Sequence, residues 1–352
     1  MKVGLIGFAA SGKSTLFSAI SRGSARDGVA SVPAPDDRLN RIVDIVKPKK
    51  VVSVHIEWHD DLPDPQTEDK PSAKATLTAA REMEALVVVL RLFDTPFAPF
   101  HSAIDPSRDL RFFLDEFALS DLQAVENRIE RLHKQIGTHR EAPSDKTEML
   151  SLERIMKALN SGKSVADVEA SNEDRQRLAS FSFLTQKPVV VAANVPEGIL
   201  GRETSDQGYA RLAELCTGLN LPLVALSATF EHEHAMAEEH EKAEYLELVG
   251  LSEARLESLQ QAVFGRFGKQ LFYTVGDDTR SWPLPIGGSA LEAAGIIHSD
   301  LARGFIRAEV CHYEDFVECG GWQPAHHAGR TKLEGREYRL KDGDVINIRF
   351  KV

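Results

Sequence analysis

The chain has 352 residues, of which 42% are hydrophobic and 27% charged, and its formal net charge is −11. These values are ordinary for a globular protein of two or three domains. The negative charge excludes a general electrostatic attraction to nucleic acid or anionic lipid, so any such contact needs a local basic patch. Three cysteines without a C-x-x-C pair, and no apolar run long enough to span a bilayer, predict a cytoplasmic protein with no membrane partner.

The most informative motif follows the first predicted strand, residues 2–6. Residues 7–14 read G-F-A-A-S-G-K-S, which fits the phosphate-loop pattern G-x-x-x-x-G-K-[ST], and a helical pattern follows at 16–20. Two glycines let such a loop curl around a polyphosphate, whose oxygens then accept hydrogen bonds from backbone amides. Lys13 supplies positive charge for the β- and γ-phosphates, and the Ser14 hydroxyl can ligate Mg²⁺. The predicted phosphate-binding residues are Ala10, Ser11, Gly12, Lys13, Ser14 and Thr15.

Short apolar, β-branched runs recur along the chain between helical patterns. They lie at residues 2–6, 51–58, 86–92, 188–193 and 223–226. This alternation predicts an α/β fold with a mostly parallel sheet that helices cover on both faces. The phosphate loop would then lie at the carboxyl edge of the first strand, where open α/β sheets bind their ligands.

A helical insertion interrupts this alternation. Residues 121–136 carry apolar side chains at heptad spacing, and a second helical pattern covers 149–159 after a polar break at 137–146. The heptad positions are Leu122, Val125, Ile129, Leu132 and Ile136. The pattern predicts an antiparallel helical arm, and two helices packed flat on the domain would fit it equally well.

The pattern changes again after residue 267. Runs at 271–275, 280–284, 305–311, 337–340 and 345–350 predict strands, with a tight turn at 341–344 and one helix near 289–294. Together they predict a small mixed or antiparallel β domain. Its basic side chains could form a patch that suits RNA or an acidic protein, although a mixed solvated surface is the default expectation. These side chains are Arg303, Arg307, Arg330, Lys332, Arg336 and Arg339.

The chain as a whole resembles one family, the YchF-type or Obg-like ATPases among the translation-factor-related P-loop NTPases. V-P-A-P-D-D-R-L at 32–39 is characteristic of that family, and G-F-I-R-A-E-V at 304–310 with D-G-D-V at 342–345 resembles its TGS domain, a ubiquitin-like β-grasp. The resemblance implies three parts. These are a P-loop nucleotide-binding domain at 1–103 and 184–267, an inserted coiled-coil arm at 104–183, and a TGS-like β-grasp domain at 268–352.

The resemblance also implies how the base is recognised. N-V-P-E at 194–197 follows a predicted strand, where GTPases carry N-K-x-D, and it is similar to the family's own variant, which is associated with ATP preference. Ser227 and Ala228 resemble the family's second base-contacting loop. The implied ligands are therefore Mg²⁺ with ATP or GTP, and Asn194 and Glu197 would contact the purine. The alternative is that Asn194 and Glu197 simply cap a loop after a strand.

Both switch regions depart from the family pattern. The first is reduced to residues 21–31 and has no threonine, and Pro63 stands where the second switch has a glycine whose amide reaches the γ-phosphate. Asp60 keeps its expected place and would support Mg²⁺ together with Ser14. We therefore expect weak or absent intrinsic hydrolysis, and no catalytic residue is legible. Partners implied by the family are the ribosome or RNA, through the arm and the TGS domain; the alternative is a non-hydrolysing adaptor that uses the same two parts.

Overall fold

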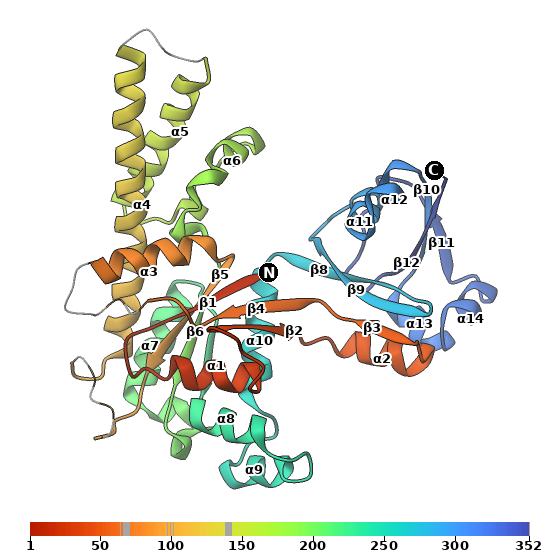
Figure 1. Cartoon of the computed structure of the whole chain (residues 1–352), viewed down its shortest axis with the longest axis horizontal. Coiled ribbons are helices and arrows are strands. Elements are labelled where there is room, and N and C mark those ends of the chain that lie inside the picture. The colour runs from red at the N-terminus through yellow and green to blue at the C-terminus, as the bar shows by residue number, and fades with distance from the viewer. Residues whose placement is uncertain are drawn as a thin grey trace. The chain divides into compact units, whose positions relative to one another are not determined.

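The computed structural model describes residues 1–63, 65, 71–96, 98, 100, 102–137 and 143–351. The chain forms two compact units, Met1–Ser31 with Glu57–Val263 and Val32–Ile56 with Phe264–Val352 (Figure 1). This division differs from the predicted one, which assigned residues 32–56 to the nucleotide-binding domain. The difference has a structural cause, because β3 (Lys50–Val52) pairs in parallel with β9 (Asp278–Pro285) of the second unit.

The first unit is built on a six-stranded sheet with the order β2-β4-β1-β5-β6-β7. Strand β1 pairs in parallel with β4 and β5, and β6 pairs in parallel with β5 and β7. Every residue of β5 is buried, as expected for a parallel strand covered on both faces. The strands are β1 (Lys2–Ile6), β2 (Val29–Pro33), β4 (His55–His59), β5 (Ala85–Arg91), β6 (Val189–Asn194) and β7 (Leu223–Leu226).

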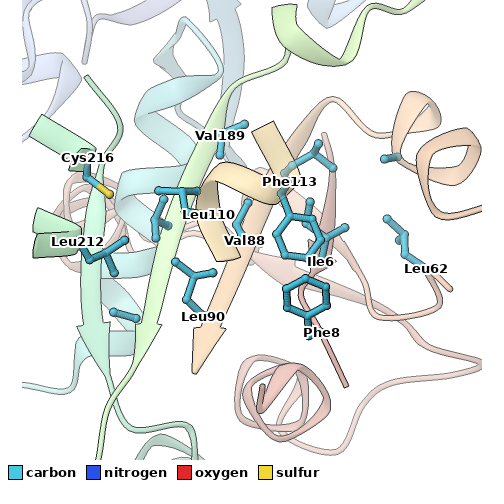
Figure 2. Close-up of a cluster of buried hydrophobic side chains, with 14 of the residues drawn as sticks. Ile6, Phe8, Leu62, Val88, Leu90, Leu110, Phe113, Val189, Leu212 and Cys216 are labelled. Atoms are coloured by element: carbon cyan, nitrogen blue, oxygen red, sulfur yellow. The ribbon is translucent and has the colours of Figure 1, made fainter. Parts of the chain in front are cut away.

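Helices pack against this sheet through a continuous apolar core. Strand side chains such as Ile6, Val88 and Leu90 share one cluster with Leu110 of α4 and Leu212 of α7 (Figure 2). Full burial of such a side chain stabilises the fold by about 1.5–3 kcal/mol, so this core fixes the strand ends that carry the site. The helices of this unit, those of the arm included, are α1 (Lys13–Ser21), α3 (Pro71–Glu82), α4 (Pro106–Gly137), α5 (Pro143–Asn160), α6 (Asn172–Leu178), α7 (Gln207–Gly218), α8 (Ala228–Met236), α9 (Lys242–Val249) and α10 (Arg255–Arg266).

The predicted single strand over residues 51–58 is wrong. The run divides into β3 and β4, which belong to different sheets. Between them the Val54 amide donates to the Ser281 hydroxyl at 3.0 Å, so the chain follows β9 before it turns into the first sheet. An apolar run indicates burial, but it does not indicate against which sheet the residues are buried.

The two long helices α4 and α5 lie side by side as the predicted arm (Figure 1). Their facing side chains form a core of their own, in which heptad residues Val125 and Leu132 pack with Leu152 and Ile155. An ion pair joins the same helices through two hydrogen bonds of 2.7 and 2.8 Å between Arg128 and Glu148. Residues 138–142 of the predicted polar break lie outside the described residues.

The arm is joined to the sheet domain by a buried polar cluster that we call the arm base. Asp121 of α4 is fully buried and accepts hydrogen bonds from the amides of Leu184 and Thr185, at 3.0 and 2.8 Å, on the segment that returns from the arm. Arg81 of α3 pairs with Asp121 at 2.9 Å and also donates to the Phe181 carbonyl at 3.1 Å. The arm base therefore connects α3 to both ends of the arm.

The second unit carries a six-stranded sheet with the order β11-β10-β12-β8-β9-β3. Strand β12 pairs in parallel with β8, whereas β8–β9, β10–β12 and β10–β11 are antiparallel. Helix α11 packs its alanines 290, 293 and 294 against Phe272 and Ile346 of the sheet, the arrangement predicted for a β-grasp. The remaining elements are α2 (Asp37–Val46), β8 (Lys269–Thr274), α11 (Ala290–Ile297), α12 (Ser299–Arg303), β10 (Phe305–Cys311), α13 (Tyr313–Cys319), α14 (Trp322–His327), β11 (Thr331–Glu334) and β12 (Val345–Phe350).

The strand predicted at residues 337–340 is also wrong, because it forms only an isolated bridge between Arg339 and Ser289. The carbonyls of Tyr338 and Arg336 accept from the first amides of α11, at 2.8 and 3.2 Å, so this segment satisfies a helix terminus. The strand that pairs with β10 at the edge of this sheet is β11, which the sequence analysis did not predict. Across the described ranges, no helix combines the length and the apolarity needed to cross a membrane.

Candidate nucleotide site

The phosphate loop connects β1 to α1 with a backbone that only glycine permits at two positions. Gly12 precedes α1 with φ 94°, and a Cβ there would lie 2.1 Å from Asn194 Nδ2. A Cβ on Gly7 would lie 2.4 Å from the Val89 carbonyl oxygen. Such distances are impossible for a real side chain, so both glycines of the motif are required by close packing.

Lys13 lies over this loop and is held by the loop's own carbonyls. Its Nζ donates to the carbonyls of Gly7 and Phe8, at 2.7 and 3.1 Å. These are neutral acceptors, and a phosphate oxygen would form a stronger, charge-assisted hydrogen bond with the same ammonium. The geometry therefore presents a cation at the start of α1, where the helix terminus also favours an anion.

Ser14 and Asp60 come together beside the loop. Asp60 follows β4 directly, and its carboxylate lies near enough to the Ser14 hydroxyl for the hydroxyl to stabilise its charged form. Burial raises the pKa of Asp60, while the Ser14 hydroxyl and the charge of Lys13 act to lower it. One carboxylate oxygen, Oδ1, is buried and has no hydrogen-bond partner among the described residues.

This pair fits Mg²⁺, which prefers a few protein oxygens completed by phosphate and water. A hydroxyl and a carboxylate with a spare oxygen supply such a partial set. The described residues contain no group of three or more His, Cys, Asp or Glu side chains that could hold a metal ion. A bound Mg²⁺ would supply positive charge between the β- and γ-phosphates.

Asn194 braces the site from the end of β6. It is 4% exposed, and both ends of its amide are used: Nδ2 donates to the Ser11 carbonyl and Oδ1 accepts from the Ala228 amide, each at 2.9 Å. The side chain thereby links the phosphate loop to the start of α8. The sequence analysis predicted that Asn194 contacts the base. In the structure, the nitrogen and the oxygen of its amide each form a hydrogen bond with the protein backbone.

The other residues predicted to contact the base lie at the same sheet edge. Glu197 is exposed in a short turn just after β6, and Ser227 follows β7 and caps α8 by accepting from the Phe230 amide at 3.4 Å. Asn194 and Leu226 are register partners on the parallel strands β6 and β7. The fold therefore brings the predicted base residues to the carboxyl edge that also carries the phosphate loop.

The two reduced switch segments are joined to each other and to α3. The Asp60 amide donates to the Gly28 carbonyl at 2.8 Å, which ties the first segment to the metal-site candidate. The Pro63 carbonyl accepts from the Thr76 hydroxyl of α3 at 2.7 Å. Positions 64 and 66–70, which the sequence interpretation included in the second switch, lie outside the described residues.

Sequence reasoning missed Arg91, the last residue of β5. It is 1% exposed, and its guanidinium donates to the carbonyl of Ala10 in the phosphate loop at 3.2 Å. It also donates to the carbonyls of Phe93 and Ala98, at 2.8 and 2.7 Å. The sequence does carry a signal for this role, since Arg91 is a charged residue at the end of an otherwise apolar strand. A charge buried in such a place needs hydrogen-bond partners.

Comparison with known proteins gives consistent matches over the whole chain. A family model named YchF-GTPase_C, described as a protein of unknown function (DUF933), matches residues 270–351. Two relatives named "Ribosome-binding ATPase YchF" are each 33% identical over 366 aligned residues. The one from Bacillus subtilis (strain 168) is aligned over 100% of both chains, and the one from Haemophilus influenzae over 100% of this chain and 99% of its own.

A solved structure, named "Structure of the Schizosaccharomyces pombe YchF GTPase", has the same fold. It matches with a TM-score of 0.87 over 99% of this chain and 97% of that chain, at 24% sequence identity.

Proposed function

We propose, because this chain belongs to the YchF family, that it is a Mg²⁺-dependent purine-nucleotide-binding protein that associates with the ribosome. One observation carries the nucleotide part. Lys13, Ser14 and Asp60 converge at the carboxyl edge of a single sheet, with a buried carboxylate oxygen left over for a metal shell. Phosphate-loop geometry of this kind binds the polyphosphate of a nucleoside triphosphate.

We infer that ATP binds at least as tightly as GTP. The two relatives carry ATPase in their names, whereas the S. pombe protein is named a GTPase. Support for ATP comes from Glu197 in place of the aspartate with which GTPases accept two hydrogen bonds from guanine. Asn194, Ser227 and Ala228 would complete the base site.

Intrinsic hydrolysis is proposed to be weak. In P-loop NTPases the protein contributes mostly positioning and electrostatics, through two switches that hold the γ-phosphate. Here the first segment lacks a threonine, and Pro63 has no amide N–H while its carbonyl is taken by Thr76. An unassisted P-loop GTPase turns over at about 10⁻⁴ to 10⁻³ s⁻¹, and we expect a rate at or below that range.

The test combines binding and turnover on the full chain. Calorimetric titration with ATP and GTP, each with and without Mg²⁺, should give Mg²⁺-dependent binding in the parent protein. Release of phosphate without a partner should stay within the range above, and Lys13→Ala serves as the control for contaminating activity. Absence of ATP and GTP binding would overturn the proposal, and faster turnover that Lys13→Ala abolishes would overturn the part that concerns hydrolysis.

Ribosome association is proposed from the names of the relatives, with the arm and the terminal TGS-like domain as the docking parts in the cytoplasm. Several arginines predicted as a basic patch are paired with acidic side chains: Arg303 with Asp300, and Arg330 with Asp315 at 2.9 Å. These pairs favour a mixed docking surface over a uniformly basic one that would attract any RNA.

A second candidate is a non-hydrolysing adaptor, favoured by the reduced switches beside an intact arm. Co-sedimentation with ribosomes in the presence of ATP, ADP or no nucleotide separates the two candidates. A nucleotide-regulated protein binds ribosomes differently in the three conditions, and Lys13→Ala removes the difference. An adaptor binds equally in all three.

A further inference from the structure

Two consecutive carbonyls of the phosphate loop accept hydrogen bonds from side chains at the ends of neighbouring strands. Arg91 Nη1 donates to the Ala10 oxygen at 3.2 Å, and Asn194 Nδ2 donates to the Ser11 oxygen at 2.9 Å. Arg91 ends β5 and Asn194 ends β6, and the two residues are register partners in the parallel ladder. They therefore stand next to each other against the same turn of the loop.

These bonds determine where the loop's amides point. In a planar trans peptide the C=O and the N–H that follows it point in opposite directions. Holding the carbonyls of Ala10 and Ser11 toward the strand ends turns the amides of Ser11 and Gly12 the other way, into the loop. Successive amides directed to one point form the concavity that binds a phosphate. The Ser11 amide donates within the loop, to the Phe8 carbonyl at 3.2 Å, which closes the turn, so the amide that this arrangement directs to a phosphate is that of Gly12.

The turn needs such support because Ala10 has φ 58°. A non-glycine residue in this left-handed region is strained and persists where its surroundings hold it. Arg91 is held firmly enough to do so. Its other donors bind the carbonyls of Phe93 and Ala98, and its guanidinium lies 4.5 and 5.0 Å from the ring centres of Phe93 and Phe100.

The charge of Arg91 is also only weakly neutralised. Nη2 has no hydrogen-bond partner within the described part of the chain, and the carboxylate of Asp94 lies 3.9 Å away with its side chain 93% exposed. An exposed carboxylate at that distance is screened by water. A buried cation directly behind the phosphate loop then favours an anion in front of it.

We propose that Arg91 is a positioning residue for the nucleotide phosphates: it holds the Ala10–Ser11 peptide so that the loop's amides face the anion. This inference rests on the proposed nucleotide binding. Arg91 acts from behind the loop, through the peptide, and not by contact with the nucleotide.

The test compares Arg91→Ala with Arg81→Ala in the full chain. Arg81 serves as the control because it is another arginine of the first unit that donates to main-chain carbonyls, in its case at the arm base, although its side chain is 20% exposed. ATP affinity by calorimetry and melting temperature without nucleotide are measured for both. We expect Arg91→Ala to weaken ATP binding by about tenfold or more, and Arg81→Ala to change it by less than about twofold even where both lower the melting temperature.

Two further measurements separate a loss of positioning from a loss of charge or of folding. Arg91→Lys retains the charge but replaces the planar fork with a point donor, so we expect a loss of about threefold. Methylguanidinium added to Arg91→Ala should restore part of the affinity, and it should leave Lys13→Ala unchanged. If Arg91→Ala does not fold, Arg91→Lys decides, and parent-like affinity in that variant overturns the inference.

Three outcomes contradict the inference, and they can be told apart. Parent-like ATP affinity in Arg91→Ala overturns it, and so do equal losses of affinity in Arg91→Ala and Arg81→Ala, which would mark a general effect of lowered stability. In both cases binding that Lys13→Ala abolishes leaves the proposed function intact. A parent protein that binds no nucleotide overturns the proposed function and this inference together.

Discussion

The phosphate loop and the arm base are both held by buried charged side chains, but they differ in whether buried polar atoms remain without a hydrogen-bond partner. At the arm base, Asp121 accepts from two amides and from the Thr185 hydroxyl and also pairs with Arg81. At the loop, Asp60 Oδ1 and Ser11 Oγ are buried and have no hydrogen-bond partner among the described residues. Because buried polar atoms are normally satisfied, the spare atoms at the loop are consistent with the proposed ligand site, whereas the carboxylate at the arm base is fully engaged by protein.

The largest expected effect tests the structural side. Asp121→Ala removes the buried member of an ion pair, so that Arg81 loses this counter-charge and two amides lose their acceptor, and the free energy of unfolding should fall by about 3–5 kcal/mol. Urea denaturation measures this. Glu130→Ala, which breaks the exposed pair with Lys134, is the control and should leave the denaturation midpoint unchanged within error, because water screens such a pair. A loss below about 1 kcal/mol for Asp121→Ala would refute the assignment of the joint.

Lys13→Ala should lower ATP affinity and leave stability nearly unchanged, the reverse of the effect on stability expected for Asp121→Ala. Removal of a charge-assisted contact worth about 1.5–3 kcal/mol lowers ATP affinity tenfold or more, while unfolding without nucleotide changes little. Lys13 Nζ donates to two carbonyls of its own loop. Equal ATP affinity in the parent and the variant, measured by calorimetry, would remove the basis of the site.

Asp60→Asn should act on binding and stability in opposite directions. Burial raises the pKa of Asp60, so the folded protein binds the proton of this carboxyl more tightly than the unfolded chain does. The bound proton stabilises the fold below the pKa of the unfolded chain, and this stabilisation is lost as pH rises through the pKa of the folded protein. At neutral pH the amide should therefore raise the melting temperature of the nucleotide-free protein, and the advantage should vanish at acidic pH. Affinity for Mg²⁺–ATP should fall about tenfold. A lower melting temperature for the variant at neutral pH would contradict this sign.

The smallest effect concerns the base. Glu197 is exposed, so Glu197→Asp should leave the fold unchanged and shift the balance of affinities toward GTP by less than about tenfold, equivalent to about 1.4 kcal/mol. Competition between labelled ATP and unlabelled GTP measures the shift. A strong GTP preference already present in the parent protein would contradict the base assignment.

Periodic and motif signals in the sequence predicted the elements that depend on local spacing. Heptad residues such as Val125 and Leu132 do form the arm core, and the loop of G-x-x-x-x-G-K-[ST] does connect a strand to a helix. Partners distant in sequence were not predictable. Asp36, within the motif at 32–39, accepts from the Tyr273 hydroxyl at 2.8 Å, so that part of the motif belongs to the second unit.

The candidate site divides in the same way. Ser14 and Asp60 were predicted to meet, because their places after two strands follow from the motif. The bracing by Arg91 and Asn194 depends on the register between β5 and β6, and no local pattern specifies which strand-end residues become neighbours. In the sequence, Arg91 stands out only as a charge at the end of an apolar run. Its hydrogen-bond partner in the phosphate loop is distant in sequence and is known only from the fold.

The pairing of β3 with β9 has a consequence for synthesis of the chain. Lys49 and Asp277, which form an ion pair beside this pairing, are separated by 228 residues. At 5–20 residues per second, a ribosome needs about ten to fifty seconds to make that interval. During that interval residues 50–52 have been made, while the strand with which they pair does not yet exist. The second unit therefore completes its sheet only as the last quarter of the chain emerges, and its early segment is exposed to chaperones and proteases until then.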